Sequence, residues 1–162
     1  MHGIDAVKYC DMENIRVSAK AIITHNGKLL TMHHRDADSD YYLLPGGGQR
    51  NGESLISTLE RECMEEAGVK VMVRDVLYIR DYIADNHEFA EFSPGFHQVE
   101  IMFQCQLLDS SKIGQGKEMD ERQIGVSWLP IDELDQHPLY PAILKKVLRK
   151  NYSKSTYLGD VN

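Results

Sequence analysis

The stretch GGGQRNGESLISTLERECMEEAG, from Gly46 to Gly68, joins a glycine-rich loop to a segment rich in carboxylates. Ser54 is a good N-cap residue, and Gly68 stands where a left-handed C-terminal cap belongs, which predicts a helix over residues 54–67. The apolar residues of this segment share one arc of the helical wheel, and they are Leu55, Ile56, Leu59, Cys63 and Ala67. The sequence therefore predicts that this helix packs one face on a core.

Three of the four carboxylates on the predicted helix share an adjacent arc of about 100°. They are Glu62, Glu65 and Glu66, whereas Glu60 lies outside the arc. Carboxylates three and four residues apart on a rigid element supply the oxygen ligands that Mg²⁺ prefers. Glycines allow the preceding backbone to approach a ligand closely. A solvated helix face explains the carboxylates alone, but the loop and helix together favour a site for a divalent metal and phosphate.

Length and composition restrict the classes of protein. The chain has 162 residues and a net charge of -7, with 42% hydrophobic and 27% charged residues, so we expect a single domain over residues 1–162. No apolar run is long enough to cross a bilayer, and we expect no signal peptide at the N-terminus. An acidic chain without a basic stripe argues against a broad nucleic-acid surface. Cys10, Cys63 and Cys105 are widely spaced, which favours reduced thiols and a cytoplasmic location.

Periodicity and turn residues predict the remaining elements. The predicted strands cover residues 15–23, 29–33, 41–44, 69–73, 76–83, 97–107 and 125–129. Asn26-Gly27 predicts a hairpin turn between the first two strands. Pro141 is expected to open a last helix, and the tail from about Tyr152 is expected to be loose. Strands interrupted by one helix and closed by another predict an α/β or α+β domain with a mixed sheet and helices on both faces.

The strand predicted at residues 97–107 alternates strictly between apolar and polar side chains, as a half-buried strand does. His97 lies on its apolar face and is interpreted as a core histidine. Glu100 lies on the opposite face, where a cavity and solvent are equally good interpretations.

The spacing of charged residues and glycines is also that of a known family. Gly47, five residues, Glu53, seven residues and then RECMEEAGV, from Arg61 to Val69, resembles the complete signature of the Nudix hydrolases, which include MutT-like proteins. At an average usage of about 7% per residue type, chance agreement at seven fixed positions is on the order of 10⁻⁸ per start point. The flanking YLLPGG and VSWLP segments are also similar to that family.

The resemblance implies a fold, a reaction and a set of site residues. The fold would be an α/β/α sandwich with a mixed, mainly antiparallel sheet. The reaction would be hydrolysis of a pyrophosphate bond in a nucleoside diphosphate linked to another group, with Mg²⁺ or Mn²⁺ as cofactor. The implied metal ligands are the carboxylates of Glu62, Glu65 and Glu66 and the carbonyl of Gly46. Arg61 would pair with Glu53 and orient the catalytic carboxylates.

Outside the signature the resemblance implies a further carboxylate, from a late loop, that serves as base or ligand. Glu121 is the first choice because it lies shortly before Trp128. Asp120, Glu118 and Glu100 remain alternatives, and a solvated loop is the plain interpretation of the acidic run.

Three residues are interpreted as candidates for substrate binding. Arg35 and Arg50 are placed to meet phosphate, although a surface arginine is the plainer interpretation of Arg35. Tyr42 is the candidate for stacking on a base, while packing is the plainer role for both Tyr41 and Tyr42. His34, at a strand end, is interpreted as an ordinary histidine.

Two functions follow from these interpretations. The first is an enzyme, a pyrophosphohydrolase acting on a nucleoside triphosphate or nucleotide sugar. The alternative is a module that binds ADP-ribose or another nucleotide without turnover. The expected partner is a small molecule and not a membrane. Because many relatives pair as dimers, a homodimer is a further expectation.

Overall fold

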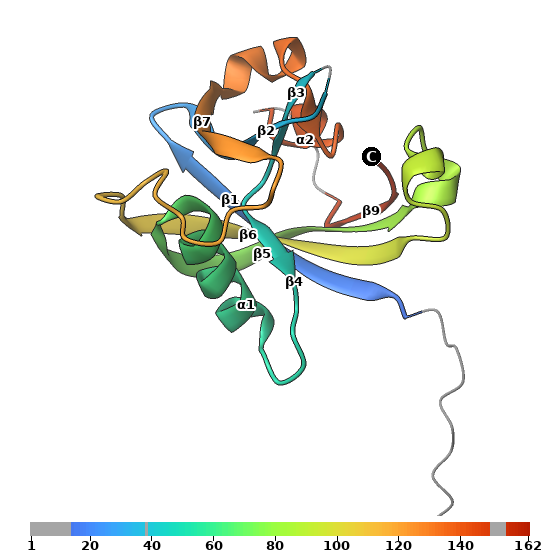
Figure 1. Cartoon of the computed structure of the whole chain (residues 1–162), viewed down its shortest axis with the longest axis horizontal. Coiled ribbons are helices and arrows are strands. Elements are labelled where there is room, and N and C mark those ends of the chain that lie inside the picture. The colour runs from blue at the N-terminus through green and yellow to red at the C-terminus, as the bar shows by residue number, and fades with distance from the viewer. Residues whose placement is uncertain (1–13, 38, 150–154) are drawn as a thin grey trace, which may run out of the picture.

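The computed structural model of the protein describes residues 14–37, 39–149 and 155–162. The described chain contains strands, two α-helices, a π-helical turn and short 3-10 helices (Figure 1). The strands are β1 (Arg16–His25), β2 (Lys28–Arg35), β3 (Asp40–Leu43), β4 (Gly46–Gly48), β5 (Lys70–Ile83), β6 (His97–Asp109), β7 (Gln123–Pro130), β8 (Leu139–Tyr140) and β9 (Tyr157–Asp160). The helices are α1 (Leu55–Glu62), the π-helical η1 (Cys63–Ala67), the 3-10 helices η2 (Ala84–Asn86), η3 (Ala90–Phe92) and η4 (Ile131–Gln136), and α2 (Leu144–Val147).

The strands form one mixed sheet in the order β8-β3-β2-β1-β6-β5-β9, with β4 paired to β1 and β7 paired to β2. The pairs β1–β6, β3–β8 and β5–β9 are parallel, and the other described pairs are antiparallel. Helices lie on both sides of β1, β5 and β6, with α1 on one side and α2 on the other (Figure 1). The predicted fold class, a mixed and mainly antiparallel sheet between helices, is confirmed.

Alternation along β1 divides the core into two clusters. Ala19, Ala21 and Ile23 pack with Leu59 and Cys63 on the α1 side. On the other side, Ile22 belongs to the cluster that includes Leu134 from η4 and both Leu144 and Val147 from α2. Because neighbouring side chains of a strand face opposite ways, β1 separates the two layers.

Local turn and cap signals in the sequence are confirmed. Asn26 and Gly27 have φ angles of 49° and 72°, as the tight turn between β1 and β2 requires. Ser54 caps α1 by accepting a hydrogen bond from the Ser57 N–H at 3.1 Å. Gly68 adopts φ 68° at the end of η1. Ile56 is an exception to the predicted apolar face, because it is 51% exposed.

The end of the long helix differs from a regular α-helix. Residues 63–67 form a π-helical turn, in which the Gly68 N–H reaches back to the Cys63 and Met64 carbonyls. A π turn inserts one residue into the helical register and is frequent at functional sites. Here it rotates the positions of Glu65 and Glu66 relative to Glu62. The helical wheel of a regular helix therefore places them only approximately.

Close packing at Gly68 leads to a prediction on stability. A Cβ atom at Gly68 would lie 2.3 Å from the Lys112 carbonyl oxygen, in addition to the strain of the positive φ. We expect Gly68→Ala to lower the free energy of unfolding by about 1–3 kcal/mol, measured by denaturant titration. Gly52→Ala is the matched control, because Gly52 has φ 87° but a Cβ atom there would meet nothing within 4 Å. Equal losses in both variants would contradict the role of the contact.

Three expectations about longer segments need correction. The two strands predicted at 69–73 and 76–83 are one strand, β5, whose pairing with β6 shifts register around Val76. The helix expected from Pro141 is short, since α2 covers Leu144–Val147. The expectation of a loose tail is wrong for residues 155–162, because β9 pairs with β5 in the register Ile79↔Tyr157. Tyr152 lies outside the described residues, as does Cys10.

Near the beginning of strand β6, the buried face is the one that alternation predicts to be polar, and the face predicted to be apolar is only partly buried. Gln98 and Glu100 are 7% and 2% exposed, and Met102 is fully buried.

Among the described residues no helix is long and apolar enough to span a membrane. Cys63 and Cys105 are free thiols.

Candidate active site

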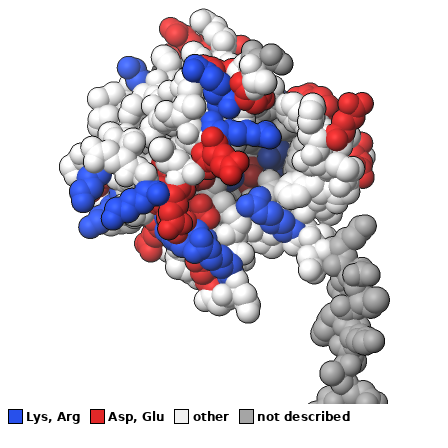
Figure 2. Space-filling model, viewed as in Figure 1, with Lys and Arg blue, Asp and Glu red and all other residues white. Residues whose placement is uncertain are grey.

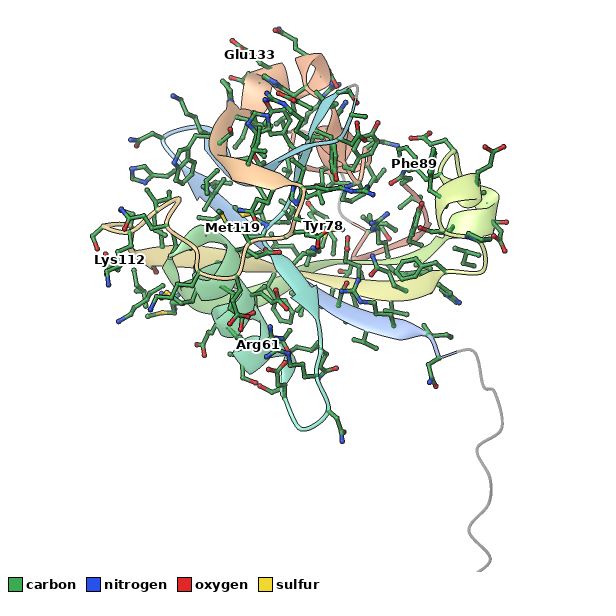
Figure 3. The ribbon with its side chains drawn as sticks, in the orientation of Figure 1. Arg61, Tyr78, Phe89, Lys112, Met119 and Glu133 are labelled. Carbon is green, nitrogen blue, oxygen red and sulfur yellow. The ribbon has the colours of Figure 1, made fainter. Side chains whose placement is uncertain are left out.

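One guanidinium group ties the glycine loop to helix α1. Arg61 Nε and Nη2 donate to the two carboxylate oxygens of Glu53 at 2.7 and 2.9 Å. Thr58 Oγ1 and the Arg50 N–H also donate to Glu53 Oε2, at 2.8 and 3.1 Å. The bonds from Arg61, followed by those from Arg50 and Thr58, lower the pKa of Glu53 to about 2. The predicted pair is therefore present, and Figure 3 shows Arg61 between α1 and the loop after β4.

The same guanidinium holds two of the three predicted metal-binding carboxylates. Arg61 Nη1 donates to Glu62 Oε1 at 2.6 Å and to Glu65 Oε2 at 2.9 Å. The Glu65 carboxylate also lies 3.8 Å from Arg50 Nη2. A cation that lies between two carboxylates attracts both, so Arg61 offsets the repulsion between Glu62 and Glu65.

Glu66 faces the glycine loop instead of Arg61. Its Oε2 accepts a hydrogen bond from the Gly46 N–H at 3.0 Å. Lys20 Nζ, from β1, donates to the Gly46 carbonyl at 2.5 Å. Burial raises the pKa of the Glu66 carboxyl, against the opposing effects of the Lys20 ammonium and the Gly46 N–H. Burial thus disfavours the charged form of the Glu66 carboxyl.

A cavity of about 270 Å³ contains these groups. Its lining includes Glu62, Glu66, Gly46 and Lys20. A Cβ atom at Gly47 would lie 2.6 Å from Glu62 Oε1, so a side chain at that position would fill the space of the carboxylate. Glycine is therefore required here for close approach of loop and helix.

The donor set of this cavity fits a hard divalent cation. Carboxylate oxygens of Glu62 and Glu66 and the carbonyl of Gly46 are all oxygen ligands, which Mg²⁺ prefers. Glu65 does not line the cavity, since its carboxylate faces Arg61 and Arg50. Within the described part of the chain, no three acidic, histidine or cysteine side chains are drawn together closely enough to hold a metal by themselves.

The late loop before β7 packs on the π turn η1. The Glu118 N–H and Gln123 Nε2 donate to the carbonyls of Glu65 and Glu66 at 3.1 and 2.9 Å. Figure 3 shows Met119, in the same loop, near α1 and β4. This contact brings Asp120 to the lining of the 270 Å³ cavity.

The four candidates for the additional carboxylate have different positions. Asp120 lines the smaller cavity, whereas Glu121 and Glu118 line neither described cavity. Glu100 is buried and accepts from Arg80 Nε at 2.9 Å, so it faces a cavity and not solvent. The structure therefore favours Asp120 over Glu121, the first choice from sequence.

A larger cavity of about 1050 Å³ lies beside the first, and the two share Arg16, Lys20, Leu43 and Leu44. Lys and Arg side chains lie on either side of a recess in this face of the molecule (Figure 2). The aromatic residues of the lining are Tyr41, Phe89, Phe92, Phe96 and Tyr140. The cavity is thus lined by cationic side chains, two of which it shares with the smaller cavity, and by aromatic rings.

The predicted substrate-binding residues lie outside both cavities. Arg35 is engaged by Asp40 in two hydrogen bonds of 2.5 and 2.9 Å. Tyr42 stacks on His33 with ring centroids 4.7 Å apart. Arg50 contacts Glu65. None of the three is among the residues that line the cavities.

Sequence reasoning missed several residues of the site. Arg16 and Lys20 line both cavities, and a signal for them existed, since they share one face of an otherwise largely apolar strand. His34 lines the smaller cavity at 4% exposure, and burial lowers the pKa of its imidazole. Tyr41 lines the larger cavity in place of Tyr42, its neighbour on the opposite face of β3.

Comparisons with known proteins show the fold and the family of the chain. A NUDIX hydrolase from Nitrosomonas europaea aligns with a TM-score of 0.70 and 21% identity, over 94% of this chain and 81% of that chain. A MutT NUDIX hydrolase from Burkholderia pseudomallei aligns with a TM-score of 0.61 and 21% identity, over 86% and 99% of the two chains. An ADP-ribose pyrophosphatase from Streptococcus suis aligns with a TM-score of 0.58 and 20% identity, over 89% and 99%.

At these identities the structural likeness shows the fold. The family model described as "NUDIX domain" matches residues 14–150, most of the chain. With the loop, helix and carboxylates in the arrangement described above, the chain belongs to the NUDIX family.

Proposed function

We propose that the protein is a metal-dependent hydrolase that cleaves a phosphoanhydride bond in a nucleoside diphosphate linked to another group, such as a nucleoside triphosphate or a nucleotide sugar. One observation carries this proposal. The carboxylates of Glu62 and Glu66 and the Gly46 backbone line a cavity that opens, through Arg16 and Lys20, to a larger one. Acidic metal ligands beside cationic phosphate ligands are what hydrolysis of a phosphoanhydride needs.

The residues present divide the chemistry between them. A divalent cation held by Glu62, Glu66 and the Gly46 carbonyl would neutralise charge on the phosphate oxygens, with Mg²⁺ the expected ion and Mn²⁺ a substitute. Arg16 and Lys20 would bind and orient the phosphates. Arg61 holds Glu62 in place through the 2.6 Å bond. The carboxylate of Asp120 lines the same cavity and would take a proton from the attacking water.

A panel of substrates tests the proposed function. Purified protein is incubated with nucleoside triphosphates, ADP-ribose and nucleotide sugars, with Mg²⁺, with Mn²⁺ or with EDTA. We expect metal-stimulated release of a mononucleotide, phosphate or pyrophosphate, and product identity shows which phosphorus is attacked. Tight nucleotide binding without cleavage of any panel member would instead support a binding module.

Neighbouring acids in the late loop provide a matched pair of variants. We expect Asp120→Asn to lower kcat by roughly 10²-fold, the lower range for loss of a general acid or base. Glu121→Gln should leave kcat within about twofold, because Glu121 does not line either described cavity. Steady-state kinetics of the best substrate measures both. A larger loss in Glu121→Gln would return the role to the residue first chosen from sequence.

A further inference from the structure

A carboxylate on the last strand anchors the start of the aromatic segment. Asp160 Oδ1 accepts hydrogen bonds from the Ile83 N–H at 3.0 Å and from His87 Nε2 at 2.7 Å. Asp160 Oδ2 accepts from Asn86 Nδ2 at 2.7 Å. Burial alone would raise the pKa of Asp160, but the bonds from Asn86, Ile83 and His87 lower it to about 2. Asp160 thus remains an anion, with three donors from the turn at the end of β5.

The segment that Asp160 holds carries most of the aromatic lining of the larger cavity. Phe89, Phe92 and Phe96 all follow the anchored turn and line the cavity. Phe92 is 82% exposed, although burial of a phenylalanine side chain would stabilise the fold. Phe89 meets Tyr140 edge to face, with ring centroids 5.3 Å apart. An exposed ring on a cavity wall is suited to contact with an apolar or planar ligand.

The rest of the C-terminal segment belongs to the same wall. The Val161 carbonyl accepts from Arg80 Nη1 at 2.5 Å, and the Asn162 carbonyl accepts from the Ile143 N–H at 3.1 Å. Asn162 also lines the larger cavity and donates through Nδ2 to Glu88 Oε1 at 3.3 Å. The segment therefore links β5, α2 and the aromatic segment.

The larger cavity combines cationic and aromatic groups. Arg16 and Lys20 of its lining are shared with the cavity of Glu62 and Glu66. The aromatic rings offer faces on which a planar heterocycle can stack. A nucleotide has both matching features, with phosphates at one end and a base at the other.

We propose that Phe89, Phe92 and Phe96 form a subsite for the nucleobase of the substrate, and that Asp160 is the positioning residue that holds this subsite in place. The proposal rests on the proposed function for the location of the phosphates. It makes a residue far from the carboxylates a determinant of base recognition. Asp160 touches no substrate and acts only through the segment that begins at Ile83.

Binding without turnover tests the subsite. The probes are the four nucleoside 5′-monophosphates and ribose 5-phosphate, which lacks a base, titrated by calorimetry in EDTA. We expect wild-type protein to bind at least one nucleotide more tightly than ribose 5-phosphate. Phe92→Ala and Asp160→Ala should each weaken the binding of that nucleotide by roughly tenfold, which is the effect of losing a base–aromatic stack. The affinity for ribose 5-phosphate should be unchanged in both variants. Asp132→Asn, on η4, is the control.

A double variant separates positioning from a general loss of structure. If Asp160 acts through the aromatic segment, Asp160→Ala combined with Phe92→Ala should weaken nucleotide binding little more than either change alone. Asp160→Asn, which keeps an acceptor for the Ile83 N–H, should retain most of the affinity and covers the case in which Asp160→Ala does not fold. With the best substrate, KM should rise more than kcat falls.

Three results would overturn the proposal. They are equal affinity of the wild type for nucleotides and ribose 5-phosphate, an equal loss for both probes in Asp160→Ala, and no effect of Phe92→Ala. Selective binding of a base without any hydrolysis would support the proposed subsite and contradict the proposed hydrolase function. Hydrolysis with no preference for a base would support the hydrolase function and contradict the subsite.

Discussion

Replacing Glu66 by glutamine is expected to lower kcat by roughly 10²- to 10⁴-fold, the range for removal of an essential carboxylate. Glu66 is the acid that faces the Gly46 backbone, at 3.0 Å from its nitrogen, and it lines the cavity with Glu62. An amide oxygen can still accept the Gly46 hydrogen bond, so the fold should remain. What the variant loses is a negative charge at the place where a cation would bind.

Glu60→Gln is the matched control on the same helix. Glu60 is exposed and lies outside the arc of the other three carboxylates. The Glu60→Gln variant should keep kcat within about twofold of the wild-type value. It should also bind Mn²⁺ as the wild type does, whereas Glu66→Gln should bind Mn²⁺ more weakly, as measured by calorimetry. Similar kcat values for Glu66→Gln and wild type would remove the basis of the proposed mechanism.

The same variant has an expected signature in stability without metal. Burial raises the native-state pKa of Glu66 above its unfolded value, so the charge destabilises the native state at high pH. Wild-type stability should therefore fall as pH rises from the unfolded pKa through the native one. Glu66→Gln should remove that fall. Denaturant titrations in EDTA at several pH values measure the difference, which should vanish below the unfolded pKa.

The second large effect concerns the ion pair beneath the larger cavity. Arg80 Nε donates to Glu100 Oε1 at 2.9 Å, and the two side chains are only 6% and 2% exposed. Arg80→Met leaves the Glu100 carboxylate buried without a cation, which typically costs about 3–5 kcal/mol. We expect a loss of that size in the free energy of unfolding, measured by denaturant titration.

Two further variants test the cause. Arg80→Met with Glu100→Leu removes both charges and should recover most of the loss, because a buried pair is often replaced by apolar residues at little cost. Arg74→Met is the control on the same strand, since Arg74 is exposed and bonded to Gln106. If the double variant were as unstable as the single one, the uncompensated charge would not be the cause.

Local features of the fold were predictable from sequence because their causes are local. Ser54 and Gly68 mark the two ends of the long helix through their own backbone preferences, and Asn26-Gly27 determines its turn directly. The π turn was not predictable, because it depends on the late loop, whose Glu118 N–H and Gln123 side chain bind the η1 carbonyls.

Burial and strand pairing depend on segments distant in the chain. Glu100 is bonded to Arg80 of β5 and to Gln98, so alternation along β6 alone could not reveal its burial. Asp160 of β9 accepts a hydrogen bond from the side chain of Asn86 in η2, which lies 74 residues away in the chain. The sequence of β9 is too short to show a hydrophobic period from which its pairing with β5 could be predicted.

The candidate site shows the same division. Within the signature, Arg61 lies on Glu53 and Glu66 lies at Gly46, whereas the Glu65 carboxylate faces Arg61 and Arg50 and does not line the cavity. Two of the three residues predicted to bind substrate, Arg35 and Tyr42, lie next to the lining residues Asp36 and Tyr41. Because successive strand residues face opposite sides, an error of one residue moves a side chain out of the cavity.

The spacing between helix α1 and strand β1 has a consequence for the chemistry. Ala19 and Ala21 are fully buried against the helix that carries Glu66. The methyl groups of Ala19 and Ala21 therefore help to determine the distance between the Glu66 carboxylate and the Gly46 backbone. We expect a bulkier pair in the core to move the helix away from the loop and to slow the reaction, although every polar group would be unchanged. The volume of this part of the core is thus expected to affect the catalytic rate.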